Sequence, residues 1–311
     1  MNKDIIFLNP VCTHNIWGGT RLNREFGYPI EGDDIGECWG ISAHPSGDGT
    51  VASGAYKGMK LSELWEKHPE LFGDTGMDRF PLLIKIIDAK DDLSIQVHPD
   101  DAYAKVHENG SLGKTECWFI LDCKENATLV VGHNAKSREE LEQMIQEGKW
   151  KEFIREIPIK PGDFIQIDPG TVHAIKGGTL LLETQQSSDI TYRVYDYDRL
   201  SNGKPRQLHI TQSIDVITVP AKSAENSVVH TEKKDDAIQQ LICCPYYTVY
   251  RIDVEHRVET WQDKPFVLMS VVEGEGTLNG TPLKKGDHLI LPDGYGKVEL
   301  QGRMQIIAST I

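Results

Sequence analysis

The sequence predicts a mainly β protein, built as a sandwich or barrel with a few short helices. The first observation is that much of the chain consists of short runs rich in apolar, β-branched and aromatic residues. The second is that Gly, Pro, Asp and Asn bound many of these runs, as turn residues do between strands. The clearest candidate strands are residues 80–87, 118–121, 127–131, 163–167 and 179–182.

Three short helices are expected between the strands. Residues 61–68 have apolar side chains at helical spacing, and Pro69 should end this helix. Ser137 and Glu140 fit a capping box, which predicts the start of a second helix. A third short helix is expected at 211–216.

The length of the chain, 311 residues, suggests about two domains. Residues 221–236 form a polar and charged stretch, which we interpret as the connection between them. The first domain is therefore expected at 1–220, with the helices inserted in it. The second is expected at 237–311, where the sequence again has the pattern of strands.

A weak internal repeat links the two predicted domains. A Gly-Asp turn at 162–163 leads through an apolar strand to His173, and a second at 286–287 leads at the same spacing to Lys297. Both copies resemble the second signature of the cupin superfamily, a strand-turn-strand that presents a metal-binding His. The resemblance implies an all-β chain of two cupin-type jelly-roll barrels, of which only the first keeps metal ligands. A chance match of two common turns is the alternative.

The charge of the chain limits its partners. A formal net charge of −14 argues against non-specific binding of nucleic acid, which needs basic patches. An anionic substrate would need a locally basic site, because the field of the whole molecule would repel it. No stretch approaches the roughly 20 apolar residues that span a bilayer, so no membrane partner is expected.

The six cysteines are expected to be reduced thiols in a cytoplasmic protein. None of them forms a C-x-x-C pair, and the N-terminal residues show no signal peptide. Disulfides are rare in the reducing cytosol. The cysteines are Cys12, Cys38, Cys117, Cys123, Cys243 and Cys244.

Four polar residues form a candidate metal site. Gln96 and His98 are two apart, so both point to one face of a strand. Glu116 precedes a buried apolar run, where a carboxylate is costly unless it is paired or ligated. His173 follows a tight turn at a strand start. Each residue alone fits a structural role, but the combined nitrogen and oxygen donors suit a catalytic Zn²⁺.

The motifs around these residues resemble the type I mannose-6-phosphate isomerase family in its short bacterial form. The resemblance covers most of residues 9–199, and the C-terminal region resembles the family only weakly. In the family, the residues that match the four candidate ligands hold zinc. The matching segments are 15–19, 36–39, 94–100, 113–116 and 170–174.

The resemblance implies interconversion of mannose 6-phosphate and fructose 6-phosphate through an enediol, with zinc polarising the sugar carbonyl. It also assigns Arg193 as a catalytic candidate. A permanent cation at this position would stabilise the enediolate or bind the phosphate. The alternative role for this arginine is a surface salt bridge with Asp189, Asp196 or Asp198.

Three further charged residues are candidates for proton transfer, and the sequence does not choose among them. Lys114 is two residues before Glu116 and matches a lysine of the family, so it is a candidate for phosphate binding or proton transfer. Glu183 ends an apolar run, where burial would raise its pKa towards that of a working base. Lys85 interrupts another apolar strand, either facing the same cavity or pairing with a buried carboxylate. Exposed, solvated side chains are the alternatives for Lys114 and Glu183.

Two rival functions remain open at this point. Two His and one carboxylate also form the triad of an Fe(II) cupin dioxygenase, although Gln96 and the cations fit a zinc enzyme of sugar phosphates better. A non-catalytic sugar-binding cupin would keep the barrel and lose the chemistry. The sequence does not determine the oligomeric state.

Overall fold

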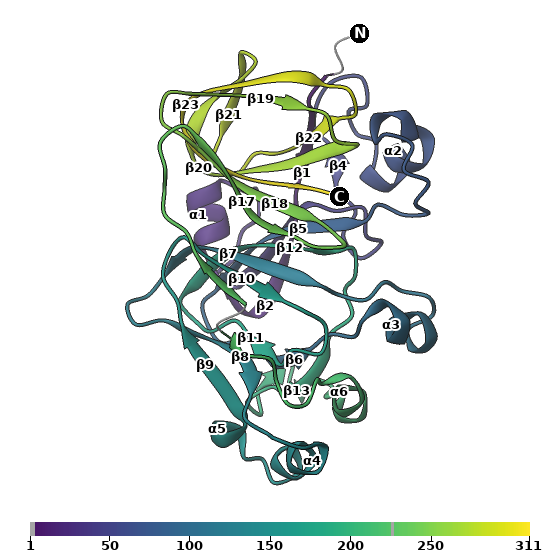
Figure 1. Cartoon of the computed structure of the whole chain (residues 1–311), viewed down its shortest axis with the longest axis vertical. Coiled ribbons are helices and arrows are strands. Elements are labelled where there is room, and N and C mark those ends of the chain that lie inside the picture. The colour runs from purple at the N-terminus through teal and green to yellow at the C-terminus, as the bar shows by residue number, and fades with distance from the viewer. Residues whose placement is uncertain (1–3, 225–226) are drawn as a thin grey trace.

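The chain forms three main antiparallel sheets stacked along the long axis of the molecule, in a computed structural model that describes residues 4–224 and 227–311 (Figure 1). Helices are few and short. The prediction of a mainly β chain with a few helices is therefore confirmed. The arrangement of the strands as two jelly-roll barrels stays a prediction.

The central sheet has seven strands, in the order β16-β10-β7-β12-β5-β2-β3. Every residue of β5 and β12 is buried, because these two strands lie in the middle of the sheet and of the molecule. The pairing of β5 with β12 places Lys85 opposite Glu183. The strands are β16 (Val228–His230), β10 (Asp163–Ile167), β7 (Glu116–Cys123), β12 (Thr179–Gln186), β5 (Leu82–Ala89), β2 (Val11–Gly19) and β3 (Ile35–Ile41).

A five-stranded sheet lies below the central one in Figure 1, in the order β13-β6-β11-β8-β9. An apolar cluster that includes Trp118 and Ile165 of the central sheet and Leu129 and Val131 of the lower sheet packs between them. This contact fixes the two sheets face to face. The lower strands are β13 (Tyr192–Tyr195), β6 (Ile95–Val97), β11 (His173–Ala174), β8 (Thr128–His133) and β9 (Ile154–Pro158).

The upper, nine-stranded sheet joins the two ends of the chain. Two N-terminal strands, β1 (Ile6–Asn9) and β4 (Thr50–Val51), complete a sheet whose other strands come from the C-terminal region. The division into domains at 1–220 and 237–311 stays a prediction, and residues 1–3 and 225–226 lie outside the described residues. The C-terminal strands are β17 (Ala237–Cys243), β18 (Thr248–Val254), β19 (Arg257–Gln262), β20 (Phe266–Leu278), β21 (Thr281–Lys284), β22 (His288–Pro292) and β23 (Gly296–Thr310).

The predicted helices are confirmed as α2 (Leu61–Lys67), α4 (Arg138–Gln146) and α6 (Ile210–Val216). The Ser137 hydroxyl accepts a hydrogen bond from the Glu140 amide at 3.2 Å and so caps α4. No helix in the described part of the chain has the length and apolar character that a membrane crossing requires. The other helices are α1 (Arg21–Phe26), η1 (Pro69–Leu71), α3 (Asp101–His107) and α5 (Trp150–Phe153).

The sequence repeat has a structural counterpart. Gly162 and Gly286 have φ angles of 89° and 93°, in the left-handed region that glycine tolerates. A strand follows each of them, β10 and β22 respectively. Both glycines thus have the backbone of a tight turn before a strand, which a repeated unit and a chance match of two turns would share. Lys297, at the position that corresponds to His173, forms an ion pair with Glu259 at the surface.

The expectation that all cysteines are reduced was wrong for one pair. Cys12 and Cys38 form a disulfide, because β2 and β3 place them directly opposite each other. Sequence spacing does not show which residues of two strands face each other. The remaining cysteines, Cys117, Cys123, Cys243 and Cys244, are free thiols.

A buried histidine joins the upper sheet to the N-terminal region. The Tyr28 hydroxyl lies 2.6 Å from His288 Nε2, and the Ser270 hydroxyl lies 2.8 Å from Nδ1. The His288 ring also packs so closely on Gly40 that a Cβ there would lie 2.2 Å from it. Burial lowers the pKa of His288 to about 4, so the ring is neutral when the protein is folded at neutral pH.

The protein is predicted to lose stability between about pH 6.5 and pH 4 in part through His288. The unfolded histidine takes up a proton near pH 6.5 and the folded one only near pH 4, so the unfolded state binds more protons in this window. This contribution to the free energy of unfolding falls by about 1.4 kcal/mol per pH unit as the pH is lowered. Urea unfolding across the window measures it.

His288→Asn should show a shallower dependence of the unfolding free energy on pH than the parent chain. His107→Asn, at an exposed position of α3, is the matched control and should keep the parent slope. Equal slopes for the parent chain and His288→Asn would contradict the prediction.

Candidate metal centre

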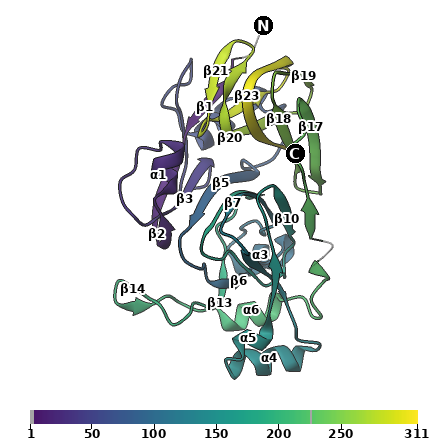
Figure 2. The ribbon, with the colours of Figure 1, turned by 90° about the vertical axis from the view of Figure 1, so that its left-hand side faces the viewer.

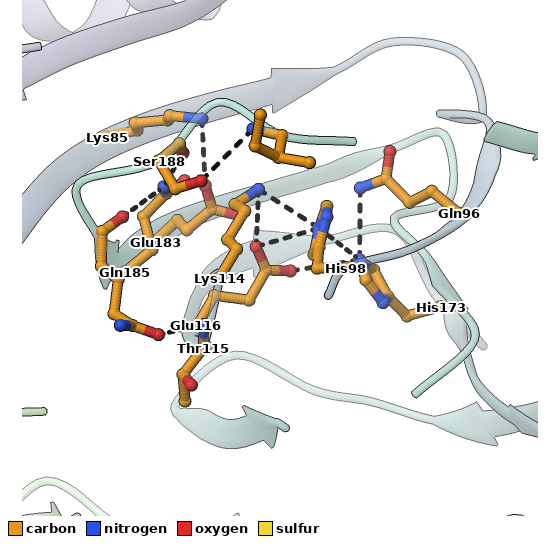
Figure 3. Close-up of polar contacts among 12 residues, drawn as sticks. Lys85, Gln96, His98, Lys114, Thr115, Glu116, His173, Glu183, Gln185 and Ser188 are labelled. Atoms are coloured by element: carbon orange, nitrogen blue, oxygen red, sulfur yellow. Dashed lines mark hydrogen bonds and ion pairs between the residues drawn. The ribbon is translucent and has the colours of Figure 1, made fainter. Parts of the chain in front are cut away.

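Three buried side chains converge between the central and lower sheets. His98 follows β6, Glu116 begins β7, and His173 begins β11. Their ligating atoms all lie within 4.8 Å of one another, and none of the side chains is more than 1% exposed. Figure 3 shows the three pointing toward one another from separate strands. The structure thus brings these three predicted ligands together.

The distances within the cluster are short. His173 Nε2 lies 3.1 Å from His98 Nε2 and 3.2 Å from Glu116 Oε1. Glu116 Oε2 lies 3.5 Å from His98 Nε2. The Nδ1–H group of His173 donates a hydrogen bond to the main-chain oxygen of Thr171 at 2.8 Å. This bond leaves the lone pair of Nε2 directed at the cluster.

The cluster has the protonation states that metal binding requires. Burial and the nearby Lys114 lower the pKa of His98 to about 3, and burial also lowers the pKa of His173. Burial alone would raise the pKa of Glu116. Lys114 and the two histidines outweigh this effect and hold that pKa well below its usual value. Two neutral imidazoles therefore face one carboxylate.

The donor set fits a divalent metal ion. Neither Glu116 oxygen has a hydrogen bond of good geometry within residues 4–224 and 227–311, and the Lys114 ammonium at 2.8 Å is its closest cation. A buried carboxylate with such incomplete pairing is costly. Two imidazole nitrogens and a carboxylate oxygen are donors that suit Zn²⁺ and also Fe²⁺. The residues present would hold either ion.

Gln96, the fourth predicted ligand, lies beside the cluster. It pairs with His173 across β6 and β11, and its Nε2 lies 3.2 Å from His173 Nε2. In Figure 3 the amide nitrogen faces the histidine and the oxygen points away. Ligation by Oε1 would need the amide to rotate, a change that its nearly symmetric shape allows.

Lys114 separates the cluster from a cavity. Its Nζ lies 2.8 Å from Glu116 Oε2 and 3.2 Å from His98 Nε2. The side chain is only 5% exposed, so the alternative of a solvated lysine was wrong. The ammonium is thus placed at the boundary between the buried carboxylate and the open space.

A buried ion pair between Lys85 and Glu183 lines the same cavity as Lys114. Lys85 Nζ is 3.2 Å from Glu183 Oε1 and 3.8 Å from Glu37 Oε1. Burial, with the charge of Glu116, raises the pKa of Glu183. Burial would lower the pKa of Lys85, but Glu37 and Glu183 outweigh it and raise that pKa. Glu183 is 3% exposed, so the alternative of an exposed carboxylate was wrong.

The cavity has a volume of about 190 Å³, and polar side chains dominate its walls. Gln96, Lys114, Glu183 and Arg193 line it, whereas the two histidines and Glu116 lie buried behind this lining. Lys85 lines the cavity and also pairs with carboxylates, so both roles considered for it apply.

Arg193 has no ion pair within the described ranges, and its buried Nε has no hydrogen-bond partner there. The three candidate partners are engaged elsewhere: Asp189 with Ser46, Asp196 with two other arginines, and Asp198 with Tyr195. The surface salt bridge considered for Arg193 was therefore wrong. Burial lowers the pKa of Arg193, yet guanidinium remains charged in proteins.

Sequence reasoning missed several residues that line the cavity. Glu37 and Trp39 are two apart on β3, and the Trp39 indole donates a hydrogen bond to Glu37 at 2.9 Å. The i, i+2 spacing was a usable signal for this pair. Asp189 and Arg206 also line the cavity, but both lie in connecting segments that offer no such signal.

Comparison with known proteins gives a consistent result. The family model described as phosphomannose isomerase type I, catalytic domain, matches residues 5–119, and the one described as mannose-6-phosphate isomerase, cupin domain, matches 237–311. Mannose-6-phosphate isomerase ManA of Bacillus subtilis is 50% identical over 99% of each chain. The mannose-6-phosphate isomerase of Streptococcus mutans is 48% identical over 98% of this chain and 97% of its own.

Solved structures agree with the sequence comparison. The crystal structure of mannose 6-phosphate isomerase from Bacillus subtilis superposes with a TM-score of 0.92 at 49% identity, covering 99% of this chain and 100% of the other. A phosphomannose isomerase variant from Salmonella typhimurium gives a TM-score of 0.80 at 16% identity, with 99% of each chain covered. At that identity the second likeness shows the fold alone.

Metal content should depend on the three converging side chains. His98→Ala and His173→Ala each remove one of the nitrogen donors, so the bound metal should fall from about one ion per chain to a small fraction. Elemental analysis of purified protein measures it. His107→Ala, at an exposed position, should retain the parent content. Full metal content in His98→Ala would remove that residue from the ligand set.

Proposed function

The chain belongs to the type I mannose-6-phosphate isomerase family, and on that premise we propose that it interconverts mannose 6-phosphate and fructose 6-phosphate through an enediol intermediate. The observation that carries the proposal is the buried His98–Glu116–His173 cluster behind a polar cavity. It lies in a chain half identical, over nearly its full length, to a curated isomerase.

The proposed resident metal is zinc, held by His98, Glu116 and His173, with the amide oxygen of Gln96 as a fourth ligand. Zinc bound there would act as a Lewis acid that polarises the oxygens of the open-chain sugar. An amide oxygen beside two imidazoles and a carboxylate leaves fewer open positions than the facial triad of Fe(II) enzymes. This donor set supports zinc over iron.

Glu183 is the proposed base for the proton that moves between the second and first carbons of the sugar. A base works best when its pKa approaches the working pH, and burial with the charge of Glu116 raises the pKa of this carboxyl. The Trp118 indole donates to Glu183 Oε2 at 3.0 Å and Lys85 approaches Oε1 at 3.2 Å, so the carboxylate is held in place.

Lys114 and Arg193 are the proposed electrostatic groups. The Lys114 ammonium lies at the cavity wall beside the cluster, where a cation stabilises negative charge developing on the enediolate oxygens. The Arg193 guanidinium has donors to spare and lines the same cavity, which suits it to the phosphate. The chain as a whole has a net charge of −14, so these two cations attract an anionic substrate only close to the cavity.

The proposed arrangement is two jelly-roll domains, with the chemistry in residues 1–220. The cluster and the cavity both lie in the central and lower sheets. The apolar core of the upper sheet extends over its C-terminal strands and contains no comparable His and carboxylate group in the described ranges. We therefore assign residues 237–311 a structural role.

Purified protein is predicted to convert mannose 6-phosphate to fructose 6-phosphate in a coupled assay, to lose turnover on chelation, and to regain it with Zn²⁺. The loss follows because the chelator removes the group that polarises the sugar. Restoration by Fe²⁺ alone, with consumption of O₂, would instead indicate the dioxygenase. No turnover by zinc-loaded protein would contradict the proposal and leave a sugar-binding role.

Glu183→Gln separates proton transfer from metal binding in the same assay. It keeps the size of the side chain and lies outside the ligand set, so bound zinc should be unchanged. Turnover should fall by about a hundredfold or more, as for loss of a general base. Unchanged kcat with full zinc would exclude Glu183 as the base.

A further inference from the structure

Two arginines pair with one buried carboxylate, Asp196, beside the cavity, and a third arginine lines that cavity. Arg206 forms a bidentate salt bridge with Asp196, in which Nε lies 2.7 Å from Oδ2 and Nη2 lies 2.6 Å from Oδ1. Arg199 Nη2 also lies 2.6 Å from Oδ1. The Asp196 side chain is 5% exposed. Arg193, which has no such partner, lies six residues before Arg199 in sequence and lines the cavity together with Arg206.

The two arginines bound to Asp196 flank a hairpin. Arg199 precedes β14 (Leu200–Ser201) and Arg206 follows β15 (Lys204–Pro205), so Asp196 holds both ends of the hairpin together. Figure 2 shows this hairpin standing away from the body of the molecule. The exposed hairpin gives Arg206 little support of its own. The buried carboxylate is what fixes the guanidinium against the cavity.

The three arginines differ in how many of their N–H donors are already hydrogen-bonded within the protein. Arg199 also contacts the main-chain oxygen of Asp92 and stacks over the Tyr197 ring, so it is occupied by the protein. Arg206 keeps its Nη1 group without a hydrogen bond among the described residues, and it lines the cavity. Arg193 keeps its whole guanidinium free of ion pairs there. Two guanidinium groups therefore offer unused donors to the same space.

The charge of the arginines around Asp196 complements that of a phosphate monoester. Asp196 and Arg199 balance each other in charge, so Arg193 and Arg206 bring two positive charges to the cavity wall, where Asp189 offsets them only in part. A phosphate monoester carries about −1.5 to −2 at neutral pH. Guanidinium forks match phosphate oxygens in geometry as well as in charge. The excess is local, because the chain as a whole is strongly acidic.

We propose that Asp196 is a positioning residue that holds Arg206 beside Arg193, so that the two arginines together receive the phosphate of the substrate. The inference rests on the proposed function for the identity of the substrate, but not for the binding of phosphate. Asp196 does not touch the sugar. It acts only through Arg206, and its loss should affect binding far more than the chemical step.

Asp196→Asn should raise KM for mannose 6-phosphate by about tenfold or more and change kcat by less than about twofold, because it weakens a charged, two-pronged contact. The inhibition constant of inorganic phosphate should rise in parallel. Arg206→Gln should do the same, and the double variant should be no worse than either single one, because both remove one coupled unit. Asp198→Asn is the matched control and should keep the parent KM, since the Asp198 carboxylate accepts a hydrogen bond from the Tyr195 hydroxyl and pairs with no arginine among the described residues.

Additive effects of the two substitutions, or a fall in kcat at unchanged KM, would overturn the positioning role. Calorimetry of inorganic phosphate with the parent chain, with Arg206→Gln and with Asp196→Asn tests the inference without turnover. If phosphate binds the parent chain and binds both Arg206→Gln and Asp196→Asn more weakly, the inference holds even where mannose 6-phosphate is not converted. If neither Asp196→Asn nor Arg206→Gln weakens phosphate binding, the inference fails while the isomerase function stands.

Discussion

The burial of the Glu116 carboxylate is the constraint on which the site depends. An ionised carboxylate withdrawn from water costs several kcal/mol unless cations or ligated metal compensate for it. Here Lys114, two residues before Glu116, supplies the cation, and His98 after β6 and His173 at the start of β11 are the neighbours with which a metal ion would be shared. The lower sheet must therefore pack on the central sheet for the carboxylate to be tolerated.

The register of the strands also brings buried charged residues of the central sheet opposite one another. Glu183 lies opposite Lys85 on β5 and opposite Trp118 on β7, and Lys85 lies opposite Trp39 on β3. Lys85 and Glu183 thus face each other across two strands, and each also faces an indole on its other neighbouring strand. A slip of one residue would turn these side chains to the other face of the sheet. The register of β5, β7 and β12 keeps the cavity wall polar, and the apolar cluster between the sheets packs beside it.

Local patterns in the sequence were sufficient for the elements and for part of the site. Turn residues and apolar runs marked β5, β7, β10 and β12 of the central sheet but not β2, β3 or β16, and the i, i+2 spacing placed Gln96 and His98 together. Contacts between distant strands were beyond such patterns. The Cys12–Cys38 disulfide, the pairing of β1 with β22, and the hold of Asp196 on Arg206 all depend on which segments meet in space. The roles of the site residues rest on chemistry that the fold permits and that experiment must test.

The most direct test of the account is anomalous X-ray diffraction from crystals of the active protein, recorded on both sides of the zinc absorption edge. The account predicts one strong zinc peak within bonding distance, about 2.0–2.2 Å, of His98 Nε2, His173 Nε2 and a Glu116 oxygen, with the Gln96 amide turned so that its oxygen faces the ion. A fully active crystal with its only metal peak elsewhere, or with none, would contradict the account.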